Sequence, residues 1–217
     1  IEARITERTK ALIVTHVCGL PAEIDRIVEV AHRHGIVVIE DCAHALLTRY
    51  KGRCVGTWGD IGSFSFQASK QMGLGDGGMA LTDNDELAGK LNLHAGAPTF
   101  MSVAYGMHYN YRMSEPVAAI GIAQLERLPG YIEGLRRAAA MLDAAVADCE
   151  FIDLQRGPAE AEHSFHLWGA TFHGERIGLP RDDFARVLEE EQVGIGMGYT
   201  NMPAYRHPLV AERLGAG

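Results

Sequence analysis

Residues 11–40 read ALIVTHVCGLPAEIDRIVEVAHRHGIVVIE, and their apolar pattern predicts a strand, a helix and a second strand. Ala11 to Val17 is a short β-branched run, typical of a buried strand. From Ile24 to Ala31, apolar residues recur at the i, i+3, i+4, i+7 spacing of an amphipathic helix. Ile36 to Glu40 is a second buried run. A strand, helix and strand in this order predict two parallel strands.

The elements predicted after Glu40 extend this sheet and then change in style. Residues 61–66 and 78–82 indicate a third and a fourth strand, and we expect all four strands to be parallel. A capping signal at Asp83 opens a helix that runs to about Leu93. The remaining predictions are a tight ribbon at 50–55, helices at 115–128 and 131–148 that are separated by Pro129 and Gly130, strands at 151–154 and 166–172, and a helix at 181–192.

The order of these elements predicts an α/β protein of two domains. Residues 1–130 would form a large domain with a mostly parallel sheet, and residues 131–217 a small α+β domain. A hydrophobic content of 47% in 217 residues is enough for a packed core. The net charge of −8 argues against a nucleic-acid or anionic-membrane surface.

The cysteines and histidines bear on location and on metals. The four cysteines are far apart and show no CxxC spacing, so reduced thiols in a cytoplasmic protein are the simplest interpretation. The pairs His32/His34 and His163/His166 lack further ligands at helical or hairpin spacing. We therefore expect no metal site.

Asp41 and Lys70 stand where ligands of open α/β sheets bind. Asp41 follows one predicted strand and Lys70 follows another, and such ligands bind at the carboxyl ends of the strands. Alone, Asp41 is more often a helix cap and Lys70 a surface lysine. The glycines after Lys70 match neither phosphate-binding pattern, because the lysine precedes them and the spacing of the dinucleotide motif is absent.

A longer series of motifs is more specific. In chain order these are Glu40-Asp41-Cys42-Ala43-His44-Ala45, Gly59-Asp60, Ser65-Phe66 with Lys70 five residues after the serine, Gly75-Asp76-Gly77-Gly78 and Tyr109-Asn110-Tyr111-Arg112-Met113-Ser114-Glu115. Their order and spacing closely resemble the DegT/DnrJ/EryC1/StrS aminotransferases, from Ile1 to roughly Tyr205. The resemblance implies the fold of type I transferases that depend on pyridoxal phosphate (PLP), similar to aspartate aminotransferase, with keto-sugar nucleotides as the main substrates.

The resemblance also implies a role for each site residue. Lys70 matches the lysine that forms a Schiff base with PLP and later moves a proton as general base and acid. Asp41 matches the acid that pairs with the pyridine nitrogen and keeps the ring an electron sink. His44 matches the residue that covers the face of the ring, where many relatives have glutamine. Lys70 and Asp41 would be the catalytic residues, and all three residues would bind the cofactor.

Three more residues are implied at its edge. Ser65 matches a contact to the cofactor phosphate. Asn110 matches an asparagine that reaches the phosphate in the neighbouring subunit, which implies a homodimer with shared active sites. Arg112 is a candidate contact to the substrate's diphosphate. Alone, each residue has a commoner role, as a strand hydroxyl, a turn residue and a solvated charge respectively.

The activity that the resemblance implies is transfer of an amino group from glutamate or glutamine to a keto-sugar nucleotide, in amino-sugar, polysaccharide or antibiotic biosynthesis. Dehydratase-type relatives carry histidine in place of the lysine, so Lys70 disfavours that reaction. A cyclitol or another carbonyl substrate stays open, as does a non-catalytic fragment or dimerisation remnant. Family members carry a long segment before the position of Ile1 and a further helix at the end, so we expect a fragment whose residues 196–203 also depart from the family pattern.

Overall fold

The computed structural model describes residues 1–95, 111–196, 198 and 202–214. It divides into two compact units, Ile1–Asp148 with Leu154–Ala170, and Cys149–Asp153 with Thr171–Gly217. The predicted domain division at residue 130 stays a prediction.

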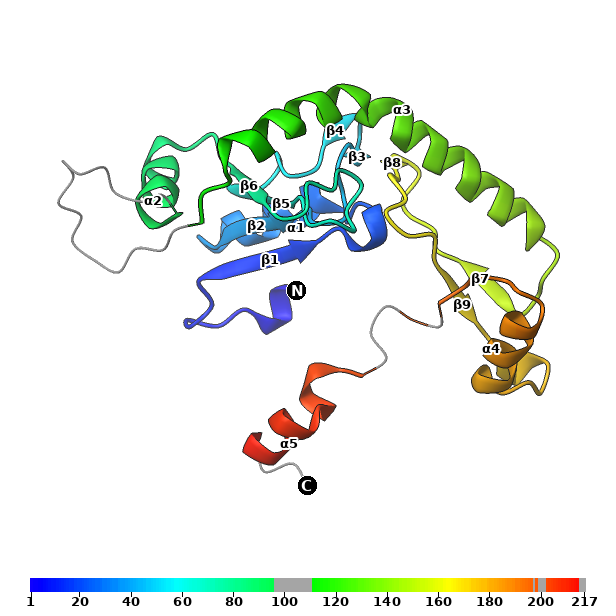
Figure 1. The fold of residues 1–217 in the computed structure, drawn as a ribbon. Helices are drawn as coiled ribbons and strands as arrows, with labels where there is room; N and C mark the ends of the chain where they lie inside the picture. Colours follow the sequence, from blue (N-terminus) through cyan, green and yellow to red (C-terminus); the bar gives the residue numbers. More distant parts are fainter. Residues whose placement is uncertain (96–110, 197, 199–201, 215–217) are drawn as a thin grey trace. The chain divides into compact units, whose positions relative to one another are not determined.

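The first unit holds most of the elements in Figure 1. In chain order they are the 3-10 helix η1 (Glu2–Arg4), β1 (Ala11–Thr15), η2 (Val17–Gly19), α1 (Ile24–Arg33), β2 (Val37–Asp41), β3 (Arg49–Tyr50), β4 (Arg53–Cys54), β5 (Ile61–Ser65), β6 (Gly78–Leu81), α2 (Asp85–Ala95), α3 (Glu115–Ala145) and β8 (Ala161–Glu162). The predicted ribbon at 50–55 is confirmed as the antiparallel pair β3–β4, and β8, which the sequence did not predict, pairs with β3.

The central sheet has the strand order β1-β2-β5-β6. Strands β1, β2 and β5 are parallel, but β6 runs antiparallel to β5, so the expectation of four parallel strands was wrong. The physical reason is the connection between the last two strands. Parallel neighbours need a crossover, usually through a helix, whereas residues 66–77 form only turns and return the chain beside β5.

The two faces of this sheet differ in chemistry. Val14 and Val38 point to the face that α1 covers, and they form a core cluster with Ile24 and Ala31 of that helix. Burial of each valine or isoleucine side chain contributes about 1.5–3 kcal/mol. Because side chains alternate along a strand, Asp41 lies on the opposite face, in register with Thr15 and Ser63.

Helix α3 is one continuous helix of 31 residues, so the predicted break at Pro129 was wrong. A proline inside a helix removes one hydrogen bond and costs about 3 kcal/mol. On either side of it, Leu128 and Ile132 are each only 2% exposed and pack with Phe66 and Met72. Their burial offsets the cost and carries the helix through. Within the described part of the chain, neither α3 nor any other helix combines the length and apolarity needed to cross a membrane.

The second unit contains most of β7 (Ile152–Leu154) and β9 (Ala170–Phe172), then η3 (Gly174–Arg176), α4 (Arg181–Glu190), η4 (Ala204–Arg206) and α5 (Pro208–Leu214). Phe172 stacks on Phe184 of α4 with ring centroids 4.2 Å apart, and Phe151 meets both rings edge-on. These three rings join the helix to the two-stranded sheet formed by β7 and β9.

Candidate active site

Asp41 ends strand β2, and its side chain has fixed partners. The backbone N–H of Ala43 donates to Oδ1 at 3.1 Å, and the Thr15 hydroxyl donates to Oδ2 at 3.4 Å. The backbone N–H of His16 donates to the Asp41 carbonyl at 3.1 Å. The carboxylate is thus held at the carboxyl ends of two parallel strands, as the sequence predicted.

Lys70 lies in the turn-rich loop after β5, and hydrogen bonds along the loop backbone fix its position. Its N–H donates to the carbonyl of Gln67 at 2.9 Å, and Leu74 N–H donates to Phe66 at 2.8 Å. A Cβ on Gly73 would lie 2.5 Å from the carbonyl oxygen of Ala68, so this glycine allows the loop to fold on itself.

His44 is held on two sides. The backbone N–H of Cys18 points to Nδ1 at 3.4 Å, so the neutral ring carries its proton on Nε2. The ring also stacks on His166, with centroids 4.3 Å apart and planes 29° apart. Burial and the charge of Lys70 lower the pKa of His44, and Asp41 acts in the opposite direction.

His166 is a site residue that the sequence reasoning missed. Burial, followed by the effects of His44 and Lys70, lowers its pKa to about 4. The next residue after Lys70, Gln71, donates its side-chain amide to the Ser164 carbonyl at 2.8 Å, so the lysine loop contacts the segment that carries His166. The sequence analysis weighed His166 only as a metal ligand together with His163. Nothing in the local sequence around His44 or His166 indicates that the two rings meet.

The remaining predicted site residues are Ser65, Arg112 and Asn110, and the structure gives fewer contacts for them. Ser65 ends β5 and shares the face of Ser63 and Asp41, and its hydroxyl accepts a long hydrogen bond of 3.4 Å from the N–H of Gln67. Arg112 is exposed in the segment before α3. Asn110 lies outside the described residues. The structure therefore brings Asp41, His44 and Lys70 to one region, and the individual roles stay predictions.

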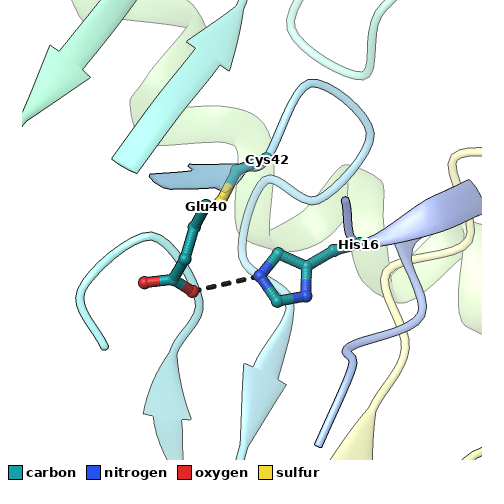
Figure 2. A group of neighbouring side chains, drawn as sticks. All are labelled: His16, Glu40 and Cys42. Carbon is teal, nitrogen blue, oxygen red and sulfur yellow. Dashed lines mark hydrogen bonds and ion pairs between the residues drawn. The ribbon is translucent and has the colours of Figure 1, made fainter. Parts of the chain in front are cut away.

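The group His16, Glu40 and Cys42 lies on the other side of Asp41's strand and looks at first like a metal site (Figure 2). One potential ligand atom of each residue lies within 4.8 Å of the others. His16 Nδ1, however, accepts a hydrogen bond from Ala22 N–H at 3.1 Å, so Nε2 carries the proton that it donates to Glu40 Oε2 at 3.0 Å. Neither ring nitrogen has a lone pair left for an ion.

The remaining two residues of this group are equally unsuited to an ion. Glu40 also accepts backbone N–H groups at 2.7 Å from Gly56, Trp58 and Gly59, which occupy both oxygens. Burial raises the pKa of the Cys42 thiol, and the carboxylates of Glu40 and Asp41 raise it further, so the thiolate that binds metals is disfavoured. The arrangement favours a buried hydrogen-bonded pair over a metal site.

The residues of the site fit PLP in the chemistry of their donor set. The carboxylate of Asp41 at a strand end suits a protonated pyridine nitrogen, and the neutral His44 ring suits stacking on the cofactor. The charge of Lys70 lowers the pKa of both histidines, and Ser65 offers a hydroxyl on the same sheet face as Asp41.

The comparisons with known proteins agree with this geometry. UDP-N-acetyl-3-dehydro-alpha-D-glucosamine 3-aminotransferase of Acidithiobacillus ferrooxidans is 42% identical over 217 residues, which cover 98% of this chain and 56% of the relative. The solved structure of DesV from S. venezuelae has a TM-score of 0.84 at 29% identity, over 97% of this chain and 56% of that one. A Streptococcus pneumoniae sugar aminotransferase in its PLP form has a TM-score of 0.74 at 25% identity, over 88% and 54%.

These similarities confirm the predicted α/β fold as a partial fold type I domain of the PLP-dependent aminotransferases. The chain spans 56–58% of the length of the curated relatives that it matches. The model of the DegT/DnrJ/EryC1/StrS aminotransferase family, whose members depend on PLP, matches residues 1–216. The chain therefore belongs to the DegT/DnrJ/EryC1/StrS aminotransferase family.

Proposed function

We propose that the chain is part of a PLP-dependent aminotransferase that transfers an amino group from glutamate or glutamine to a keto-sugar nucleotide. The observation that carries the proposal is the joint placement of Asp41, His44 and Lys70 at the carboxyl end of the sheet. The substrate class is supported by the Acidithiobacillus relative, whose name states a UDP-sugar substrate. An amino-sugar, polysaccharide or antibiotic pathway would use the product.

Each site residue has a chemical task in this reaction. Bound PLP would supply an electron sink for the negative charge that forms when the substrate carbon loses a proton. Asp41, held by Ala43 and Thr15, would keep a proton on the pyridine nitrogen. Lys70 would hold the cofactor through its Nζ and, once released, take and return the proton at the substrate carbon. His44 would cover the ring face as a neutral imidazole.

Several finer points belong to the proposal. Ser65 would donate its hydroxyl to the cofactor phosphate, and Asn110 would reach the phosphate of the neighbouring subunit, which requires a homodimer. Arg112, exposed before α3, would contact the diphosphate of the substrate. A cytoplasmic location would suit a nucleotide-sugar substrate and reduced cysteines.

An absorbance titration with PLP tests the proposal, using the chain expressed with whatever sequence its gene encodes on either side. We expect a visible band that borohydride reduction fixes onto the peptide containing Lys70. Lys70→Ala should abolish that labelling and turnover, and Lys90→Ala, on the exposed side of α2, should leave both unchanged.

Two further results bear on the alternatives. Asp41→Asn should lose most of the turnover and keep most of the cofactor binding, because the electron sink needs the carboxylate. Wild-type turnover in Lys70→Ala would refute the assignment, and a wild-type protein without PLP uptake would favour a non-catalytic role. A screen of keto-sugar nucleotides against cyclitol ketones would identify the substrate class.

A further inference from the structure

The segment His163–Leu167 is fastened to the turn that holds His44. Ser164 N–H donates to the carbonyl of Gly19 at 3.1 Å, and Leu167 N–H donates to that of Cys18 at 3.2 Å. Gln71, the residue after Lys70, donates its side-chain amide to the Ser164 carbonyl at 2.8 Å. The segment is therefore tied both to the His44 support and to the lysine loop.

Two buried hydroxyl groups, from Thr48 and Ser164, also join the segment to Gly19. Thr48 donates to the Gly19 carbonyl at 2.9 Å and lies 2.7 Å from the Ser164 hydroxyl, and both side chains are fully buried. Gly19 has a φ of +94°, and a Cβ there would lie 2.6 Å from Ser164 Oγ and 2.9 Å from the His44 carbonyl. Only glycine permits so close an approach of the two segments.

The hydrogen bonds of Ser164 and Leu167 to residues 18 and 19 fix the position of His166 between them. The His166 ring stacks on the His44 ring, with centroids 4.3 Å apart. The backbone N–H of Cys18 donates a hydrogen bond to Nδ1 of the same His44 ring. Cys18 itself has a left-handed φ of 61°, an uncommon conformation for a residue with a side chain. The hydrogen bond from Cys18 and the stack on His166 together restrict rotation of the His44 ring.

The charges around the two rings favour their neutral forms. The titratable groups that act on the pair are Lys70 and Asp41, with the Cys18 backbone beside them. Burial and the lysine lower the pKa of both histidines, and Asp41 opposes this only for His44. Two imidazolium rings 4.3 Å apart and near a lysine would repel each other, so the stacked pair disfavours protonation of both rings together.

We propose that His166 is a positioning residue of the active site, which holds the His44 ring in its Nε2-protonated, neutral form for stacking on the cofactor. The part of this inference that concerns stacking on the cofactor rests on the proposed function. The orientation and tautomer of His44 are properties of the chain without cofactor, so they can be measured separately.

The test compares His166→Ala with His166→Phe, which keeps a ring at the stack but cannot titrate. The first readout is an NMR pH titration of the His44 imidazole without cofactor. In His166→Ala we expect the His44 midpoint to rise toward the ordinary value near 6.5 and the Nε2-protonated signature to weaken. In His166→Phe both should stay as in wild type. His207→Ala, at an exposed position, is the matched control.

The second readout is PLP affinity by absorbance. We expect a loss of about tenfold in His166→Ala, since its His44 ring has lost the aromatic ring stacked on one face, and a change within about threefold in His166→Phe. Thermal unfolding of each variant separates these effects from loss of the fold. If wild type takes up PLP but His166→Ala leaves both the His44 titration and the affinity unchanged, the inference is wrong. If wild type takes up no PLP, the proposed function fails instead.

Discussion

Replacement of Glu40 by glutamine should destabilise the first unit strongly. The Glu40 carboxylate is fully buried and accepts four hydrogen bonds, two at each oxygen, from His16 and the backbone of residues 56, 58 and 59. A glutamine NH₂ at either oxygen position faces two donors that then lack an acceptor. Each buried donor left unpaired costs about 1–3 kcal/mol, so we expect a loss of about 2–6 kcal/mol.

Urea unfolding followed by tryptophan fluorescence measures this loss, because Trp58 lies in the loop that Glu40 fastens. In a protein of this size the change corresponds to a lower melting temperature by on the order of 10 °C. Glu86→Gln is the control, since Glu86 is exposed on α2 and forms a surface ion pair with Lys90 at 2.6 Å, and we expect no measurable change.

The pH dependence gives a second, independent signature. Burial acts to raise the pKa of Glu40, but hydrogen bonds from His16, Gly59 and Gly56 outweigh it and hold the pKa below the ordinary value of 4.5. A lowered folded-state pKa contributes stability that is present above 4.5 and is lost as the pH falls through the folded-state value. The difference between wild type and Glu40→Gln should therefore shrink in acid. A loss under about 0.5 kcal/mol at pH 7 would refute the reasoning.

Three further predictions concern other positions. Gly19→Ala should cost several kcal/mol because its Cβ would clash with a buried hydroxyl, whereas Gly35→Ala, with a φ of +65° but no atom within 4 Å of the new Cβ, should cost only about 1 kcal/mol in urea unfolding. Pro129→Ala should raise the free energy of unfolding by about 1–3 kcal/mol, because it restores a hydrogen bond at an exposed position inside α3, and an unchanged value would mean that the helix is broken there. Cys42 should resist iodoacetamide at pH 8 in the native chain, since burial raises the pKa of its thiol, and should react once urea is added, with peptide mass as the readout.

Local patterns in the sequence determined much of the fold. The runs at 11–17 and 36–40 became β1 and β2, and the amphipathic stripe between them became α1, because alternation and the 3.6-residue period are properties of short segments. The same local order placed Asp41 at the end of β2 and Lys70 in the loop after β5, and the series of motifs around them identified the family.

Tertiary structure decided what depends on distant partners. The direction of β6 follows from how its loop returns, and α3 continues past Pro129 because Leu128 and Ile132 are buried against Phe66 and Met72. The buried Glu40 carries no local signal either, since its partners are His16, the residue after β1, and a loop sixteen to nineteen residues further along the chain. His166 meets His44 across 122 positions through hydrogen bonds at Gly19. Such contacts arise from packing free energy between segments, which no pattern within one segment contains.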